Sequence, residues 1–244
     1  MLNAVARFTS RFVTLAFGGS CFLCGGSSRD AADPAQVLCA ACEHSLMPPP
    51  AERCPVCALR TPGGGTCGRC IAKPPAFDTT VCLSDYDFPA DVLVQALKFR
   101  GELSLAGLFG RMIRSRIEPG DLASPDCVVP VPISDSRMRE RGFNQSMEIA
   151  RAIVSAGGPP VDSALAVRTR ETAPQAGLPW KERARNLRGA FHCDPRAQGL
   201  RVAVVDDVMT TGSTLDELAV TLKSAGARSV VNWVVARTPA AGAF

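Results

Sequence analysis

The sequence has few aromatic residues, and it lacks the two glycine-rich motifs that identify many nucleotide-binding proteins. Only 6% of the 244 residues are Phe, Trp or Tyr, so we expect no aromatic platform for stacking nucleic-acid bases. The absence of GxxxxGK(S/T) argues against a P-loop, and the absence of GxGxxG argues against a dinucleotide-binding fold. No apolar run reaches the roughly 18–20 residues of a membrane span, so none is predicted.

The charge is nearly balanced, and the start of the chain departs from the pattern of an export signal. The formal net charge of +4 suits an anionic ligand or nucleic acid without deciding between them. The first residues resemble a signal peptide in their apolar character, but Arg7 and Arg11 interrupt the apolar stretch. We predict instead a short amphipathic helix that packs on the rest of the protein, and a cytoplasmic location.

Cysteine, in contrast, is abundant, and its spacing is regular. Eight of the eleven cysteines form four Cys-x-x-Cys pairs between residues 21 and 70. Each pair can present two thiolates from one tight turn, and two pairs complete a tetrahedral metal site. Tandem pairs of this kind are typical of structural metal sites in a reducing compartment rather than of secreted disulfide frameworks. The candidate metal ligands are Cys21, Cys24, Cys39, Cys42, Cys54, Cys57, Cys67 and Cys70.

The spacing leaves the grouping of these pairs open. Sequential grouping makes one site from the first two pairs and another from the last two, and an interleaved grouping fits the spacing as well. Four thiolates without a redox partner favour zinc, although iron is also compatible. A closed four-thiolate site has no open coordination position, so we predict two structural zinc ions without a catalytic role.

Pro74 and Pro75 close the cysteine-rich segment, and α/β periodicity follows. The apolar fraction of 46% is ample for a core. We predict an N-terminal helix and double zinc ribbon over residues 1–76, and an α/β domain with a parallel sheet flanked by helices over residues 77–244. Predicted strands cover residues 81–86, 127–132, 202–205 and 230–235, and predicted helices cover residues 89–99, 103–117, 144–153 and 215–224.

Residues 202–214, VAVVDDVMTTGST, form the motif with the most specific chemistry. A buried strand runs into Asp206 and Asp207, and a loop of threonine, glycine and serine then opens a helix. Backbone N–H groups, hydroxyls and the helix dipole together make such a loop a phosphate site, and the acids could hold hydroxyls or Mg²⁺. Ordinary helix capping is the alternative, but capping does not need paired acids and a five-residue polar loop.

Two further segments suggest ligand contacts. Residues 133–143 follow a predicted strand and contain Arg137, Arg139 and Arg141, at the end of the sheet where α/β proteins bind anions. A solvated basic loop is the alternative interpretation. Residues 167–193 are rich in Arg and irregular, and we predict a lid over the ligand.

With these residues in view, the chain resembles the ComF family, in which a double zinc ribbon is joined to a type I phosphoribosyltransferase-like domain. VAVVDDVMTTGST resembles the motif by which type I phosphoribosyltransferases bind 5-phosphoribosyl-1-diphosphate (PRPP). LKFRGE at residues 97–102, RERGFNQ within residues 130–145, and Gln175 followed by ERARNLRGAF resemble ComF elements, and the four Cys-x-x-Cys pairs match the family's N-terminal segment. The resemblance covers nearly the whole chain, and Met209 is the one position in the motif that departs from many members.

The resemblance implies roles for individual residues. Asp206 and Asp207 would meet the ribose hydroxyls and, through them, Mg²⁺. The 5′-phosphate would be held by Thr210, Thr211, Gly212, Ser213 and Thr214. Candidates for the pyrophosphate are Lys98, Arg139 and Arg141.

Two functions follow from this resemblance. The first is a phosphoribosyltransferase, a pentosyl-transferring enzyme that moves phosphoribosyl from PRPP to an acceptor that the sequence does not identify. The second is a non-catalytic PRPP-binding accessory protein for DNA uptake and natural transformation, which contacts single-stranded DNA or a protein of the competence machinery. An amidophosphoribosyltransferase is disfavoured, since the chain has no recognisable glutamine-hydrolysing domain.

Overall fold

The computed structural model describes residues 20–27, 36–47, 52–118, 120–121, 124–155, 157–170 and 187–240. Internal contacts group the chain into two compact units, Met1–Pro48 and Pro49–Phe244, so the third and fourth cysteine pairs belong to the unit that contains the sheet. The boundary expected between residues 76 and 77 stays a prediction. The expected N-terminal helix and most of the expected lid lie outside the described residues. No helix within the described part of the chain is long and apolar enough to cross a membrane.

The first unit is small and is built around two of the cysteine pairs. Helix α2, Ala40–Leu46, begins directly after Cys39. Before it, a tight turn closes when the N–H of Cys21 donates to Gly26 O at 2.7 Å. Leu38 and Leu46 are the buried aliphatic side chains among its described residues. Because few apolar side chains are buried among these described residues, we expect a metal bound by the cysteines to contribute to the folding of this unit.

The second unit contains a four-stranded parallel sheet, which confirms the predicted fold class. The strands follow the order β1–β6–β5–β2, and every pair is parallel. Their bounds are β1 Thr79–Asp85, β2 Cys127–Pro130, β5 Arg201–Met209 and β6 Ser229–Arg237. Strand β5 is longer than predicted, because its pairing with β6 continues to Met209 opposite Arg237. The two acids therefore lie within the strand, and the loop begins after Met209.

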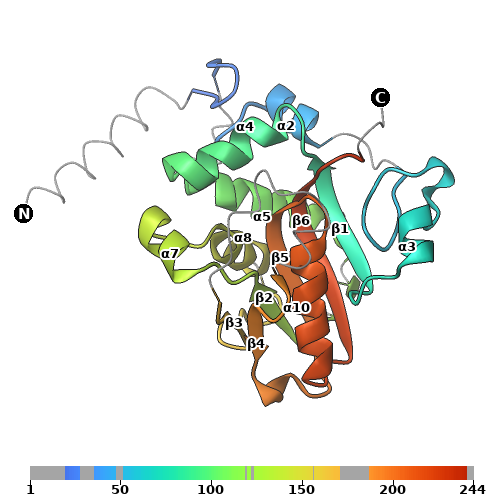
Figure 1. The fold of residues 1–244 in the computed structure, drawn as a ribbon. Helices are drawn as coiled ribbons and strands as arrows, with labels where there is room; N and C mark the ends of the chain where they lie inside the picture. The colour runs from blue at the N-terminus through green and yellow to red at the C-terminus, as the bar shows by residue number, and fades with distance from the viewer. Residues whose placement is uncertain are drawn as a thin grey trace, which may run out of the picture. The chain divides into compact units, whose positions relative to one another are not determined.

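Helices cover both faces of this sheet (Figure 1). Helix α10, Ser213–Ser224, packs on one face, and helices α5, Ser104–Arg116, and α8, Gln145–Val154, pack on the other. Asn144 caps α8 as predicted, since its side chain accepts from the N–H of Ser146 at 3.0 Å. Helices α5 and α8 approach closely at Gly110, where an added Cβ would lie 2.3 Å from the Cβ of Ala152.

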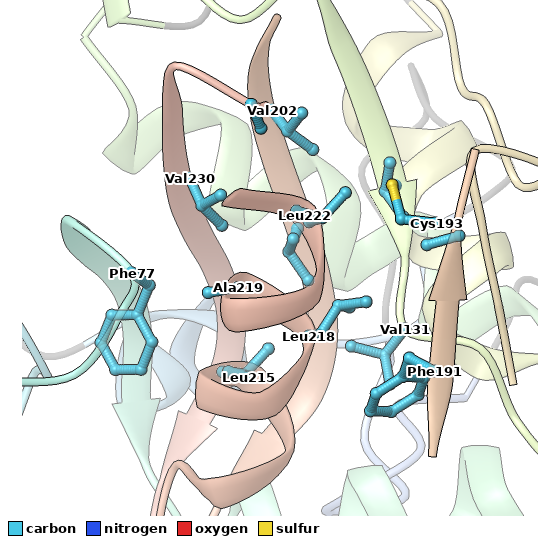
Figure 2. Packing of buried hydrophobic residues seen from close by; sticks show 14 of the residues in the cluster. Phe77, Val131, Phe191, Cys193, Val202, Leu215, Leu218, Ala219, Leu222 and Val230 are labelled. Atoms are coloured by element: carbon cyan, nitrogen blue, oxygen red, sulfur yellow. The ribbon is translucent and has the colours of Figure 1, made fainter. Parts of the chain in front are cut away.

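The core beneath α10 joins three parts of the second unit. Leu215, Leu218 and Leu222 of α10 pack with sheet residues that include Val202 and Val230 (Figure 2). Side chains of the short antiparallel pair β3, Ala166–Arg168, and β4, Phe191–Cys193, extend this cluster on one side. Buried members of the cysteine-rich segment extend it as well, namely Cys54, Cys57 and Cys70.

Three local predictions differ from the structure. Residues expected as a basic loop form helix α7, Asp135–Arg141, which ends at Gly142 in the left-handed region that favours glycine. The helix after Pro89 divides into α4, Ala90–Gln95, and a π-helical turn η2, Ala96–Arg100. The ends of the expected lid pair as β3 and β4, so within the described residues they are strands rather than an irregular loop. The remaining short elements are η1 Pro62–Gly64, α3 Gly68–Ala72 and η3 Pro195–Ala197.

Candidate functional site

The eight predicted metal ligands form two separate clusters of four thiols. Cys21, Cys24, Cys39 and Cys42 make the first cluster, and Cys54, Cys57, Cys67 and Cys70 make the second, which settles the grouping as sequential. Within each cluster all sulfur atoms lie within 4.8 Å of one another.

The geometry of both clusters fits a zinc ion. A tetrahedral site with Zn–S bonds of about 2.3 Å places its sulfurs about 3.8 Å apart. The Sγ atoms of Cys24 and Cys39 are 3.7 Å apart, and those of Cys57 and Cys67 are 3.5 Å apart. The N–H of Cys67 also donates to Cys54 Sγ at 3.3 Å, a contact that stabilises a thiolate. These residues could hold one structural zinc ion per cluster, and the donor set leaves no position for substrate.

The acid pair lies near the carboxyl end of β5, the strand in the middle of the sheet beside β6. Asp207 is 6% exposed, and its Oδ1 lies 2.9 Å from Nζ of Lys98 on the turn η2. Asp206 Oδ1 accepts from Ser146 Oγ at 3.1 Å and from the N–H of Asp207 at 2.9 Å. The structure thus brings the predicted LKFRGE segment to the predicted acid pair, from positions more than one hundred residues apart.

The electrostatics of this pair favour a neutral carboxyl at Asp206. Burial, and then the neighbouring charge of Asp207, raise the pKa of Asp206 to about 7. Lys98 and the two hydrogen bonds oppose this shift, because each favours the ionised form. A group with a strongly raised pKa beside a cation is typical of sites that bind or react, although structural networks show the same shifts.

The loop after β5 has the shape expected for an anion site at a helix N-terminus. Thr210 is exposed, and Thr211, Ser213 and Thr214 are half-buried. Thr211 Oγ1 and Ser213 Oγ lie 2.9 Å apart, and the N–H of Ser213 donates to Thr211 Oγ1 at 3.2 Å. Gly212 has a φ of 82°, a backbone conformation that residues with a side chain rarely adopt, and it is the N-cap residue of α10. The loop therefore carries hydroxyls at the N-terminus of α10, where the first-turn N–H groups have no partner within the helix.

The predicted pyrophosphate ligands lie on two helical segments near the acids. The guanidinium of Arg141 lies 5.3 Å from the ring centre of Phe99, which neighbours Lys98 in η2. Burial, and then the charge of Arg137, lower the pKa of Arg141 from its ordinary value. Arg139 lies on the same helix α7 with an exposed side chain. Lys98 is the one of these three whose side chain is paired with the acid pair in the described structure.

Four further residues belong to this region and were not predicted as site residues. Ser146 binds Asp206, and its neighbour Gln145 is buried with an Nε2 that has no hydrogen-bond partner among the described residues. Arg69 and Arg237 donate to backbone carbonyls of the phosphate loop. The RERGFNQ segment points to Gln145, but the sequence has no local signal for the two arginines.

The sequence is similar to proteins named for DNA utilization and competence, and no family model matches it. It is 36% identical over 208 residues to the DNA utilization protein YhgH of Salmonella typhi, covering 82% of this chain and 90% of that protein. It is 32% identical over 178 residues to competence protein F of Haemophilus influenzae, covering 70% and 78%. Competence protein ComFC of Bacillus subtilis is 24% identical over 216 residues, covering 84% and 86%.

Solved structures with partial likeness are phosphoribosyltransferases. The glutamine PRPP amidotransferase of B. subtilis, solved with ADP and GMP, has a TM-score of 0.36 and 21% identity. That match covers 53% of this chain and 25% of the amidotransferase, so the chain spans about a quarter of that enzyme's length. A phosphoribosyltransferase from Corynebacterium diphtheriae has a TM-score of 0.30 and 20% identity, covering 58% and 76%.

Proposed function

Because the chain belongs to the ComF family of competence and DNA utilization proteins, we propose that its α/β domain binds PRPP with Mg²⁺ and transfers the phosphoribosyl group to an acceptor, with release of pyrophosphate. The observation that supports this most directly is the contact of Lys98 with Asp207. It joins an acid pair, a hydroxyl-rich helix N-terminus and a basic segment at one end of a parallel sheet, where α/β proteins bind their ligands.

Each part of the site matches one part of the proposed ligand. The loop from Thr210 to Thr214 would receive the 5′-phosphate on its N–H and hydroxyl groups. Asp206 and Asp207 would accept hydrogen bonds from the two ribose hydroxyls. Lys98, Arg139 and Arg141 would neutralise the pyrophosphate, and Mg²⁺ bound with PRPP would share that charge.

The chemistry then requires orientation and charge stabilisation. An acceptor lone pair forms a bond to C1 of the ribose while the bond from C1 to the pyrophosphate oxygen breaks. The electron pair of that bond leaves with pyrophosphate, and the acceptor's proton passes to water. Basic side chains that face the leaving group stabilise the charge that develops on it. The acid pair holds the ribose so that C1 stays exposed to the acceptor.

Binding is tested by melting the protein with and without Mg²⁺ and PRPP. A ligand that binds only the folded state at one hundred times its dissociation constant adds about 2.7 kcal/mol, so the melting temperature should rise by several degrees. Replacing both acids, Asp206→Asn and Asp207→Asn, should abolish the rise. Asp126→Asn is the matched control, because Asp126 pairs with Arg201 at the opposite end of the same sheet. A wild-type protein that shows no rise would refute PRPP binding.

Catalysis is tested on the same sample by pyrophosphate release over a panel of amines and nucleobases. Release that depends on one acceptor and on the acid pair supports the transferase. Binding without release over the panel supports the second function, in which PRPP is a structural or regulatory ligand.

That second function is favoured by the names of the relatives and by the arginines of α7, of which Arg139 is exposed. An accessory protein for DNA uptake would use such arginines to contact the phosphates of single-stranded DNA, and binding of that kind weakens steeply with added salt. Affinity for an oligonucleotide should then fall between 50 and 200 mM salt, and Arg139→Gln should reduce the salt slope. Affinity that does not change with salt would argue for a protein partner instead.

A further inference from the structure

The guanidinium of Arg237 links the phosphate loop to a residue of the second cysteine cluster. Arg237 ends β6 and is 1% exposed. Its Nε donates to the backbone oxygen of Cys57 at 2.9 Å, and its Nη1 donates to Met209 O at 2.9 Å and also to Thr210 O. One buried side chain therefore binds the backbone of a candidate metal ligand, the carbonyl of the last residue of β5 and the carbonyl of the first residue of the loop.

Arg69 makes a second link from the same cluster. It lies in helix α3 between Cys67 and Cys70, and its Nη2 donates to the backbone oxygen of Thr211. A Cβ at Gly212 would lie 3.7 Å from this nitrogen, so the guanidinium charge lies directly beside the loop. The position of Arg69 depends on the fold of α3, a five-residue helix that begins after Cys67 and contains Cys70.

Asp85 fixes the cluster segment to the sheet itself. This carboxylate ends β1 with 4% exposure, and it accepts from Arg53 Nη1 at 2.8 Å and from Arg60 Nε at 2.5 Å. Both arginines lie next to the Cys54–Cys57 turn. These contacts attach the cluster segment at the carboxyl ends of β1, β6 and β5, which is the end of the sheet that carries the acid pair. Thr80, near the start of β1, also donates to the backbone oxygens of Pro55 and Val56.

The direction of these bonds determines where the loop N–H groups point. In a trans peptide the C=O and the following N–H point in opposite directions. Arginines that hold the carbonyls of Met209, Thr210 and Thr211 on one side therefore turn the N–H groups of residues 210–212 to the other side. Successive N–H groups that converge in this way make a concave anion site.

We propose that the second cysteine cluster, with its metal bound, positions the phosphate loop, and that Arg237 and Arg69 are the positioning residues that couple the two. The proposal rests on the proposed function, since it deepens the role of the same loop. It assigns no such role to the first cluster. Coupling of two binding sites is reciprocal, so a metal that favours PRPP binding must itself be held more tightly when PRPP is bound.

The first test compares Arg69→Gln with the matched control Arg60→Gln. Both replace an exposed arginine of the same segment, but Arg60 contacts Asp85 rather than the loop. Without the Arg60 side chain, Asp85 would still be paired with Arg53. Titration calorimetry with Mg²⁺-PRPP should show about tenfold weaker binding for Arg69→Gln, since a less organised loop must be ordered on binding. Arg60→Gln should bind within twofold of the wild type, and Arg69→Lys should recover part of the loss.

The second test measures zinc release. A merely structural role of Arg69 would not make the rate of zinc release depend on PRPP. In the full chain carrying Cys21→Ser and Cys24→Ser, the remaining zinc reports on the second cluster. Mg²⁺-PRPP should slow its transfer to a chromogenic chelator severalfold, and Arg69→Gln should remove most of this protection. The Arg69→Gln variant is also the control for zinc that PRPP binds directly.

The outcomes separate the two proposals. A wild-type protein that does not bind PRPP overturns the proposed function. A wild-type protein that binds PRPP, with Arg69→Gln equal to Arg60→Gln and zinc release independent of PRPP, overturns the coupling alone.

Discussion

The two cysteine clusters have the same ligands and similar sulfur spacing, but they differ in their surroundings. In the second cluster three of four cysteines are buried, and Cys54, Cys57 and Cys70 belong to the apolar core beneath α10. In the first cluster only Cys21 is buried, and Cys24 is exposed. The first cluster lies in the unit Met1–Pro48, whereas the second lies in the unit that contains the sheet.

This difference predicts different roles for two clusters that share the same local motif. Among the described residues of the first unit, Leu38 and Leu46 are the buried aliphatic side chains, so we expect its four cysteines to contribute much of the local fold. In the second cluster's segment, by contrast, arginines and a backbone carbonyl form hydrogen bonds at the ends of three strands. We therefore expect the loss of metal from the second cluster, rather than from the first, to affect the proposed ligand site.

Removal of one thiolate from each cluster should give the largest contrast. Cys57→Ser should lower the melting temperature of the Pro49–Phe244 unit by about 15 °C, which corresponds to a loss of roughly 4–6 kcal/mol, a fraction of the free energy that a structural zinc supplies. Cys24→Ser should leave this transition within about 2 °C. Calorimetry with metal analysis checks both, and zinc content should fall in each variant. Equal shifts would break the comparison.

Substitution of Arg237 should give an intermediate effect. Arg237→Lys keeps the charge but loses the fork that reaches Cys57 O and Met209 O together. Carbonyls left without a donor cost about 1–3 kcal/mol each, so the melting temperature should fall by about 8 °C. Burial lowers the pKa of Arg237, which indicates that its charge already stands in an unfavourable environment. An unchanged melting temperature would show that the link contributes no stability.

Replacement of Asp206 should give the smallest effect, with the opposite sign. Its pKa is raised to about 7 in the folded protein, above the unfolded value near 3.9, so this group makes stability fall as pH rises from about 4 to 7. Asp206→Asn removes that loss and should stabilise the sheet unit by about 1–2 kcal/mol at pH 8, with little change at pH 4.

Asp126→Asn supplies the comparison for this last substitution. Hydrogen bonds from Arg201 lower the pKa of Asp126 to about 2, so its contribution is present above pH 4 and is lost as pH falls through 2. At pH 8 the melting temperature should therefore rise for Asp206→Asn and fall for Asp126→Asn. At pH 4 it should change little for Asp206→Asn. A lower melting temperature of Asp206→Asn at pH 8 would contradict the assignment.

Much of the fold could be predicted because its signals are local. The cysteine pairs predicted both clusters, the apolar runs predicted parallel strands, and Asn144 predicted the start of α8. The extension of β5 through Asp206 and Asp207 was missed, because polar residues at the end of a buried run look like the start of a loop. Helix α7 was missed because a run of arginines has no apolar face.

The candidate site was predictable only in part, for a different reason. The acids and the hydroxyl-rich loop form one continuous sequence motif. The prediction that Lys98 belongs to the same site came from the family resemblance and not from residue spacing. Arg237 and Arg69 bind backbone carbonyls, and a carbonyl acceptor leaves no trace in the sequence. Contacts between a side chain and a distant backbone are therefore the part of this site that needs the structure.

The contact at Gly110 has a consequence for the acid pair. Helix α8 touches α5 at Ala152 and carries Ser146 six residues earlier, about 9 Å along the same rigid rod. A methyl group at position 110 would push α8 away from α5, and the Ser146 hydroxyl that donates to Asp206 would move with α8. The close approach of α5 and α8 therefore sets the position of Ser146 relative to Asp206. A substitution at Gly110 can thus weaken ligand binding without changing any atom that faces the ligand.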